Sequence, residues 1–414
     1  MRTVKWNPFL SGVCAVLGGA WMWAGTAVAD VSSTNAAGLI MYPKLLVNGN
    51  ATYTSQDTLI QLTNTADEPV NVRCFYANAT GVCIIPTDTT DPLKACNPSD
   101  PTQFDGPTCA VANSPCIAKW QETDFKMRLT SKQPIAWWVS EGLSQLPLSP
   151  DGPFGQPGPK GEFNDNSSIP PAPEKPFLGM LTCVEVDADE RPVDRNDLKG
   201  EATIKTLDSG IVDIRNYNAL GIQAISGQND GNDYLFLGLE YNNCPNVVIL
   251  DHFFDDAILD ENTSVRTHLT LVPCTQDFLG QQCSTPDAPS TVVQYLVFNE
   301  YEQRFSTSKS MKCHQEITLS DIDTRLGGTG DAQSIFNINV QGTYTGQTLL
   351  RGVENPDTGP FLGNGILALA EEFVTYRPGE GVPRTRSDAF ATHQRGSRGD
   401  LNTIAMPPAG AAEP

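Results

Sequence analysis

Apolar and polar residues alternate along most of this chain, whereas long stretches with the i, i+3, i+4 spacing of an amphipathic helix are absent. Side chains of a strand point alternately to its two faces, so this alternation predicts strands with one buried and one solvated face. The 31 prolines and 35 glycines favour turns between short strands and support an all-β fold. Clear alternating segments are residues 58–62, 70–75, 125–129 and 335–340.

Two neighbouring strands of this kind occur twice in the chain. The first copy covers residues 58–64 and 70–74, and the second covers 291–299 and 305–313. Residues 65–69 should form the hairpin turn between the two strands of the first copy. Because a repeated block of paired strands is typical of related domains, the sequence predicts two tandem β-sandwich domains.

Similar segments frame each copy. An apolar leading strand precedes the block, at residues 39–47 in the first copy and 265–272 in the second. A Pro-Phe-Leu-Gly sequence with an apolar run follows, beginning at Pro176 and at Pro360. Residues 144–176 are rich in proline and glycine and have only a short counterpart before Pro360, so we expect an insertion within the first domain.

These boundaries give the predicted organisation of the chain. The residues between the copies contain further strand segments, which either extend the sandwiches or form a bridging layer. The C-terminal residues hold few large apolar side chains and are predicted to be disordered, because they cannot bury enough surface to offset chain entropy. The predicted order is a signal peptide at 1–29, a first β-sandwich domain at 30–187, a β-rich connecting segment at 188–262, a second β-sandwich domain at 263–376 and a disordered tail at 377–414.

The N-terminus has the features of a secretion signal. Arg2 and Lys5 precede an uncharged, mostly apolar stretch at residues 10–25, and Ala27 and Ala29 form a small-residue cleavage site. We therefore expect export to the periplasm or the extracellular space, with no membrane span in the mature chain. The net charge of −21 argues against nucleic acid and anionic membrane surfaces as partners, because both would repel the protein.

The cysteines predict disulfides. Removal of the leader, which contains Cys14, leaves ten of the 11 cysteines, and an even number in an exported chain is typical of disulfide bonding. No pair has the Cys-x-x-Cys spacing of a zinc or haem site. Cys274 and Cys283 flank a short loop and form the simplest pair. Three cysteines of one long loop are expected to pair with each other or with Cys83: Cys96, Cys109 and Cys116.

A cluster of carboxylates follows the apolar run of the first copy. Calcium binds about six to eight oxygen atoms, which carboxylates in a loop could supply, so calcium is the one metal that the sequence suggests. A solvated acidic turn is the favoured interpretation, because the spacing lacks the glycine and the closing glutamate of an EF-hand. No other cofactor is expected. The four residues are Asp187, Asp189, Asp194 and Asp197.

The sequence lacks the common catalytic motifs. It contains no Gly-x-Ser-x-Gly elbow, no Ser-x-x-Lys accompanied by its partner motifs and no phosphate-binding glycine loop. The densest mixture of histidine and carboxylates could build a metal site or an acid/base pair, but a metallohydrolase normally needs more than one histidine. It consists of Asp251, His252, Asp255, Asp256, Asp260 and Glu261. A polar loop at the end of a strand is the favoured interpretation, and we do not expect an enzyme.

Trp137 and Trp138 are adjacent in a predicted strand. Neighbouring strand residues point to opposite faces, so one indole can enter the core while the other should face outward. An outward indole can stack on a sugar ring or anchor a protein partner, which makes these two the candidate ligand-binding residues. The alternative is that the proline-rich insertion or the other domain covers the second indole, which would then be structural.

Residues 60–64 and 70–72 resemble the central hairpin of immunoglobulin-like modules in bacterial envelope proteins, where an apolar strand ends at Asn, turns and returns as Val-x-Val. Residues 297–299, with the following strand to Cys313, resemble it more loosely. The whole chain is similar to secreted bacterial proteins of unassigned function. The resemblance implies export and tandem immunoglobulin-like sandwiches, and it carries over no catalytic or binding residue.

Taken as a whole, the sequence predicts an exported, disulfide-stabilised, tandem β-sandwich protein. Its expected function is non-enzymatic, as a structural, adhesive or partner-binding module of the cell envelope or the extracellular space. The alternative is a carbohydrate-binding module that uses an exposed tryptophan, with or without calcium. The expected partner is accordingly an envelope protein or a glycan.

Overall fold

The computed structural model describes most of the chain between Val31 and Pro407. Within the described residues the fold is all-β, as predicted, and its paired strands are antiparallel. The predicted leader at 1–29 and most of the proline-rich segment lie outside them. The described residues are 31–51, 54–84, 93–95, 116–118, 120–143, 168–172, 174–208, 210–255, 257–273, 278, 290–322, 334–354, 363–379, 383–395 and 402–407.

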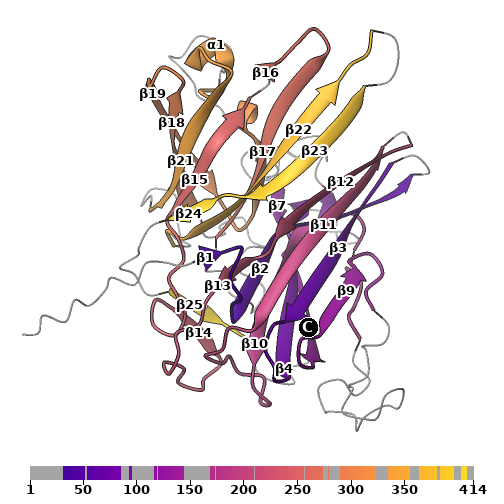
Figure 1. Cartoon of the computed structure of the whole chain (residues 1–414), viewed down its shortest axis with the longest axis vertical. Coiled ribbons are helices and arrows are strands. Elements are labelled where there is room, and N and C mark those ends of the chain that lie inside the picture. The colour runs from indigo at the N-terminus through magenta and orange to yellow at the C-terminus, as the bar shows by residue number, and fades with distance from the viewer. Residues whose placement is uncertain are drawn as a thin grey trace, which may run out of the picture.

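The N-terminal strands form two layers that face each other, here called the N-terminal sheet pair (Figure 1). One layer has the order β8 (Gln121–Leu129), β4 (Val70–Asn78), β10 (Phe177–Val186), β2 (Leu39–Ala51), β13 (Leu220–Ile222) and β1 (Val31–Ser32). The other has the order β9 (Pro134–Trp138), β3 (Thr54–Asn64), β11 (Leu198–Asp208) and β12 (Ile211–Asn218). The layers join where β2 pairs with the start of β3.

The C-terminal strands form two further layers, the C-terminal sheet pair. One layer has the order β19 (Arg304–Met311), β18 (Thr291–Asn299), β21 (Thr345–Val353), β15 (Val247–Phe254) and β24 (His393–Arg395). In the other layer β17 (Thr263–Pro273) pairs with β22 (Ile366–Tyr376), and β22 pairs with β23 (Arg384–Ala391). The opposite edge of β17 pairs with β16 (Ala257–Ile258) and β20 (Gln315–Thr318).

Smaller elements complete the described part of the chain. β5 (Gly81–Ile84) pairs with β6 (Leu93–Ala95) and β7 (Cys116–Ala118). β14 (Tyr234–Leu237) pairs with β25 (Asn402–Ala405). A 3-10 helix, η1 (Leu319–Asp321), and one short α-helix, α1 (Ile338–Gln341), are the helices of the described residues.

Each sheet pair encloses its own apolar core, and aromatic rings fill both. In the N-terminal core the indole nitrogen of Trp137 donates a hydrogen bond to the Tyr76 hydroxyl at 2.6 Å. In the C-terminal core the ring of Phe336 meets those of Phe253 and Tyr295 edge-on. The Trp137 hydrogen bond removes the cost of burying a polar N–H, so the indole can sit in an otherwise apolar interior.

The repeat is visible in the strand pairing, but its two copies differ. In both copies the leading strand pairs with the last strand, β2 with β10 and β17 with β22. The second copy contains a hairpin of β18 and β19. The hairpin predicted for the first copy is wrong, because β3 pairs with β9 and β11 whereas β4 pairs with β8 and β10. Residues 65–69 instead carry the chain from one layer to the other.

An asparagine at the end of the first repeated strand organises the turn in both copies. The amide nitrogen of Asn64 donates to the carbonyl oxygens of Glu68 at 2.7 Å and Thr130 at 2.9 Å. The amide nitrogen of Asn299 donates to the carbonyl oxygen of Gln341 at 2.6 Å. Thr130 lies where the chain passes between β8 and β9, which belong to opposite layers, so Asn64 is fixed at a crossing point. Asn299 is fixed against α1 and turns back within its own sheet.

Residues 335–340 were expected to form a strand, and this prediction is wrong. They form a turn followed by α1. The Asn337 side chain accepts a hydrogen bond from the backbone N–H of Asn339 and caps the helix. Gly342, with φ at 83°, ends it after one turn. The alternation of Ile335 and Phe336 with polar residues reflects two anchors in the core rather than a pleated strand.

The prediction of a disordered tail at 377–414 is wrong for residues 384–395 and 402–405. β23 pairs with β22, β24 pairs with β15, and β25 pairs with β14. The tail does not need a core of its own, because its few apolar side chains enter cores that other strands build. Ala389 joins the N-terminal core, and Ile404 and Met406 join an apolar cluster between the sheet pairs.

The connecting segment at 188–262 is divided between the layers. β11 and β12 extend the layer of β3, and β15 lies in the C-terminal layer beside β21. β14 pairs with the tail strand β25, and its Leu235 and Leu237 are fully buried in the cluster between the sheet pairs. The segment therefore extends both sheet pairs and also supplies a small layer between them.

A buried group of charges joins the two sheet pairs. Glu371 of β22 is fully buried, and its carboxylate accepts from Lys44 of β2 and from Arg215 of β12, each at 2.5 Å. Lys44 also pairs with Glu316 of β20. Burial alone would raise the pKa of Glu371, but the two cations and their hydrogen bonds lower it to about 2. The charge group is therefore ionised and internally compensated.

Candidate functional site

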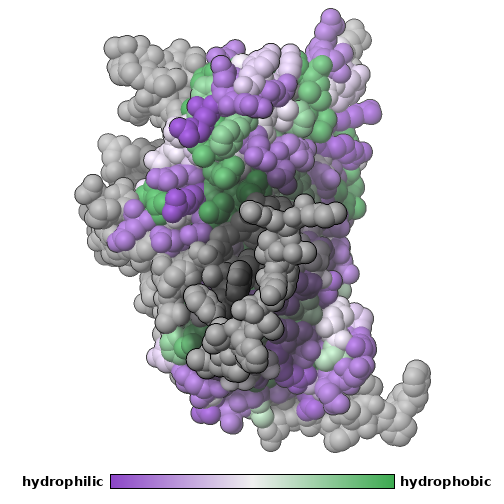
Figure 2. All heavy atoms as spheres, turned by 60° about the vertical axis from the view of Figure 1, so that its left-hand side comes forward, coloured by the Kyte–Doolittle hydropathy of each residue, from purple (hydrophilic) through white to green (hydrophobic). Residues whose placement is uncertain are grey.

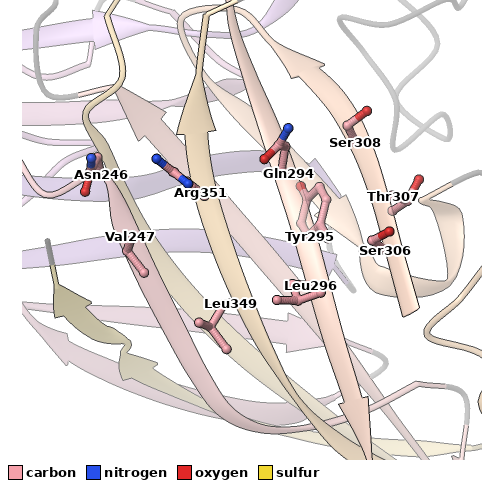
Figure 3. A pocket seen from close by; sticks show the side chains of 10 residues that line it. All are labelled: Asn246, Val247, Gln294, Tyr295, Leu296, Ser306, Thr307, Ser308, Leu349 and Arg351. Carbon is pink, nitrogen blue, oxygen red and sulfur yellow. The ribbon is translucent and has the colours of Figure 1, made fainter. Parts of the chain in front are cut away.

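A shallow groove crosses the outer face of the layer formed by β19, β18, β21 and β15 (Figure 3). Strand register places Val247, Arg351, Gln294 and Ser308 in one row across the four strands. The adjacent row holds Leu349, Leu296 and Ser306. The groove, here called the sheet-face groove, has a volume of about 780 Å³. It is lined by Asn246, Val247, Gln294, Tyr295, Leu296, Ser306, Thr307, Ser308, Leu349 and Arg351.

The floor of the sheet-face groove is apolar, although it lies on the outside of the sheet. Leu296 and Leu349 are half-buried neighbours on adjacent strands. An outward position is normally polar in an antiparallel sheet with one face in water. When the molecule is turned to bring the left-hand side of Figure 1 forward, hydrophobic patches appear between hydrophilic side chains in its upper half, where this layer lies (Figure 2). Exposed apolar patches rimmed by polar residues are typical of a surface that binds another molecule.

Arg351 gives the groove its electrostatic character. It is the one charged side chain among the described lining residues. Its guanidinium is exposed and makes no ion pair or hydrogen bond with any of the residues described by the structure. Gln294 and Ser308, its neighbours in the same row, likewise keep free hydrogen-bonding groups. An unpaired guanidinium above an apolar floor can bind a carboxylate through two parallel hydrogen bonds.

The two adjacent tryptophans face opposite sides of β9, as predicted. Trp137 is 2% exposed in the core, so it cannot reach a ligand. Trp138 is half-buried on the outer face, where the ammonium of Lys205 lies 6.0 Å from the centre of its ring. It borders a pocket of about 350 Å³, here called the Trp138 pocket. The lining residues are Val47, Asn48, Gly49, Ser55, Gln56, Asp57, Trp138, Ser140, Glu141, Lys175 and Lys205.

The four carboxylates suggested for calcium do not converge. Asp187 accepts hydrogen bonds from the backbone N–H groups of Asp189 and Arg191 and so closes a turn. Asp194 accepts from the backbone N–H of Gly227, and Asp197 pairs with a neighbouring arginine. Among the described residues, no group of three or more His, Cys, Asp or Glu side chains has the arrangement of a metal site. These carboxylates organise the loops that leave β10.

The residues around His252 do not form one cluster, because some of them face solvent and Asp255 is buried. His252 is exposed, its Nε2 lies 3.4 Å from the carboxylate of Glu372, and its ring stacks on Phe390. Asp255 is 1% exposed, whereas Asp251 is exposed to solvent. Asp251 and His252 lie in the bulge of β15 between Leu250 and Phe253, whereas Asp255 follows the end of the strand.

One disulfide joins neighbouring strands of the N-terminal sheet pair. Cys74 of β4 and Cys183 of β10 lie directly opposite each other and are bonded. The sequence did not predict this pair, because the predicted pairs join cysteines that are close together in the chain. Cys244 and Cys313 each take part in a disulfide as well. The predicted pairings of Cys96, Cys109, Cys274 and Cys283 concern residues outside the described part, and Cys116 is described by its backbone, which lies opposite Cys83.

Neither models of known protein families nor curated protein sequences match this chain. No helix among the described residues has the length and apolar character needed to cross a membrane.

The sheet-face groove was not predicted from the sequence, because its lining comes from four strands whose order along the chain is not their order in the sheet. The sequence held one weak signal for the groove, because Leu296 and Leu349 are apolar although they occupy outward positions of their strands.

Proposed function

We propose that this chain is an exported, non-enzymatic, partner-binding protein of the cell envelope or extracellular space, built from two tandem immunoglobulin-like β-sandwiches. Its sheet-face groove binds an extended, carboxylate-bearing segment of a partner protein. The observation that carries this proposal is the unpaired Arg351 guanidinium, which lies beside the half-buried Leu296 and Leu349.

Two features support the tandem immunoglobulin-like architecture. The leading and final strands pair in the same way in both sheet pairs, and the first copy changes layers between β3 and β4, as Greek-key sandwiches do. The Cys74–Cys183 bond departs from the antibody pattern, because it joins neighbours of one layer rather than the two layers. The likeness therefore concerns architecture and not the antibody disulfide.

Export is supported by the leader and by the disulfide. Arg2, Lys5, the apolar stretch and Ala29 have the composition of a cleaved signal. Disulfides such as Cys74–Cys183 persist in oxidising compartments and are rare in the cytosol. A non-enzymatic role is supported by the sequence, which lacks a nucleophile elbow and a phosphate-binding loop.

The chemistry of the groove selects an extended and acidic occupant. Its open shape over flat strands suits a peptide better than a compact molecule, and alternate side chains of an extended peptide could rest on Leu296 and Leu349. The rim groups of Gln294 and Ser308 can bond the peptide backbone. In a chain with a net charge of −21, the lone Arg351 of the groove attracts a carboxylate that most of the surface repels.

The proposal can be tested by selecting displayed short random peptides on the purified mature protein. We expect the enriched peptides to combine alternating apolar residues with an Asp or Glu. Arg351→Gln should weaken the selected peptides about tenfold and erase the preference for Glu over Gln in the peptide. Leu296→Asp should abolish binding, because it removes the apolar floor and adds a repelling charge.

The matched control is Tyr301→Ser. Tyr301 is 73% exposed on the turn between β18 and β19, in the same layer but outside the groove lining. This variant should bind the selected peptides as the unchanged protein does. Peptides that bind Arg351→Gln with unchanged affinity, or a selection without enrichment, would contradict the proposal.

A further inference from the structure

We propose that the Trp138 pocket is a binding site for an acidic sugar, such as a hexuronate residue of a polysaccharide. This site lies on the outer face of the N-terminal sheet pair, on β2, β3, β9 and β11, whereas the sheet-face groove lies on the C-terminal sheet pair. It is therefore a second recognition site, which does not depend on the protein partner.

Strand register builds the aromatic platform of the pocket. Trp138 of β9 lies opposite Leu59 of β3, and Lys205 of β11 lies opposite Asp57, which precedes Leu59 by two residues on β3. Trp138 and Lys205 are thus diagonal neighbours across β3, which explains why the ammonium reaches the indole ring. The apolar C–H face of a pyranose can stack on the exposed part of this indole.

Lysines give the pocket its preference for an anion. Neither Lys175 nor Lys205 forms an ion pair with any side chain in the described ranges. Two carboxylates, Asp57 and Glu141, also line the pocket. Asp57 is held by the backbone N–H of Thr58 at 2.8 Å and by Ser140 through its N–H at 3.2 Å and its hydroxyl at 2.5 Å. Because three donors already hold Asp57 and neither lysine pairs with Glu141, both ammonium groups remain available for a ligand carboxylate.

The remaining lining groups match sugar hydroxyls. Asn48, Gln56 and Glu141 stand around the pocket and offer both donors and acceptors. A volume of about 350 Å³ is within the usual range for a small-ligand site. A simple inorganic anion would use the lysines but neither the indole nor the amides, so the full set of groups favours a sugar that carries a carboxylate.

Tryptophan fluorescence offers a direct test on the mature full-length chain. Its three tryptophans are Trp120, Trp137 and Trp138, and the first two are 3% and 2% exposed. A fluorescence change on titration with oligogalacturonate therefore reports mainly on Trp138. We expect saturable binding that weakens with added salt, and at least about tenfold weaker binding of the matching neutral galactose oligosaccharide.

Substitutions in the pocket separate the contribution of the lysine from that of the indole. Lys205→Met should remove the preference for the acidic over the neutral oligosaccharide, and calorimetry should show that Trp138→Ala loses about tenfold or more in affinity. Trp138→Tyr, which keeps an aromatic face, should retain binding, and Arg351→Gln should bind the sugar normally. Equal affinity for the acidic and neutral sugars, unchanged binding by Trp138→Ala, or the absence of binding would overturn the proposal.

Discussion

His314 is fully enclosed between the two sheet pairs, where its ring can hold only one proton. Its Nε2 lies 3.1 Å from the carbonyl oxygen of Pro43, which can only accept, so this nitrogen carries the hydrogen. Its Nδ1 is buried and has no hydrogen-bond partner among the described residues. Burial lowers the pKa of His314 to about 4, because a second proton would place an uncompensated N–H in the interior.

We expect His314 to make the folded protein sensitive to acid. Its folded pKa lies below the ordinary value of 6.5, so the unfolded chain binds the proton more tightly. Stability is therefore present above pH 6.5 and is lost as the pH falls from 6.5 towards 4, by up to about 3 kcal/mol. Urea unfolding at pH 7 and pH 4.5 should show a smaller acid loss, by about 2 kcal/mol, in His314→Phe than in the unchanged protein. Equal losses in both proteins would refute this role.

Among the elements, β23 shows how a strand can depend on neighbours rather than on its own composition. It pairs along β22, and its Ser387 backbone N–H donates to the Asp213 carboxylate of β12 at 3.1 Å. Arg386 also donates to the carbonyl oxygen of Val212. β23 therefore lies against β12 of the N-terminal sheet pair. Its outer residues are polar because its role is to hydrogen-bond across this junction.

Ala389 is the residue of β23 that enters the N-terminal core. Ala389→Asp should lower the free energy of unfolding by about 3 kcal/mol, because the carboxylate would be buried without a partner. The control Thr385→Asp, on the exposed end of the same strand, should change it by less than about 0.5 kcal/mol. Urea unfolding followed by circular dichroism measures both. Similar effects at the two positions would show that β23 does not contribute to the core.

Strand identity could be predicted from the sequence because it depends on local alternation, as in β8 and β17. The paths between strands could not. Residues 65–69 look like a hairpin turn, but the strand pairings show that they cross between layers, and the Asn64 side chain bonds the distant Thr130 at this crossing. The outward position of Trp138 follows from strand parity alone, whereas the sheet-face groove depends on the order of four strands in the sheet, which the sequence does not give.

At the scale of the whole molecule, the two sheet pairs are joined through buried charges rather than by a flexible linker. Lys44 and Arg215 come from the N-terminal sheet pair, and Glu371 and Glu316 come from the C-terminal one. Each cation loses its hydration on burial. Lys44 is compensated by Glu371 and Glu316 of the opposite sheet pair, whereas Arg215 is compensated by Glu371 and also by Thr206 and Asp213 of its own sheet pair. The charge group therefore couples the folding of the two halves.

We expect Glu371→Gln to break this coupling. The change leaves Lys44 and Arg215 buried without a full counter-charge, which should cost about 3–5 kcal/mol. Calorimetry should show one unfolding transition in the unchanged protein and two separated transitions in the variant. Glu372→Gln is the control, because burial raises the pKa of this neighbouring, half-buried carboxyl and a neutral amide replaces it at little cost. Two transitions in Glu372→Gln as well would argue against a specific role for Glu371.

The Cys74–Cys183 disulfide also determines how the molecule would carry mechanical load. The two cysteines are 109 residues apart in the chain but are bonded side by side on β4 and β10. Tension applied to the chain ends would pass from β4 to β10 through the sulfur bridge. The residues between them, which include β8, β9, Trp138 and the proline-rich segment, would bear none of it. When the chain is stretched from its ends, the residues between Cys74 and Cys183 would therefore not extend unless the disulfide were reduced.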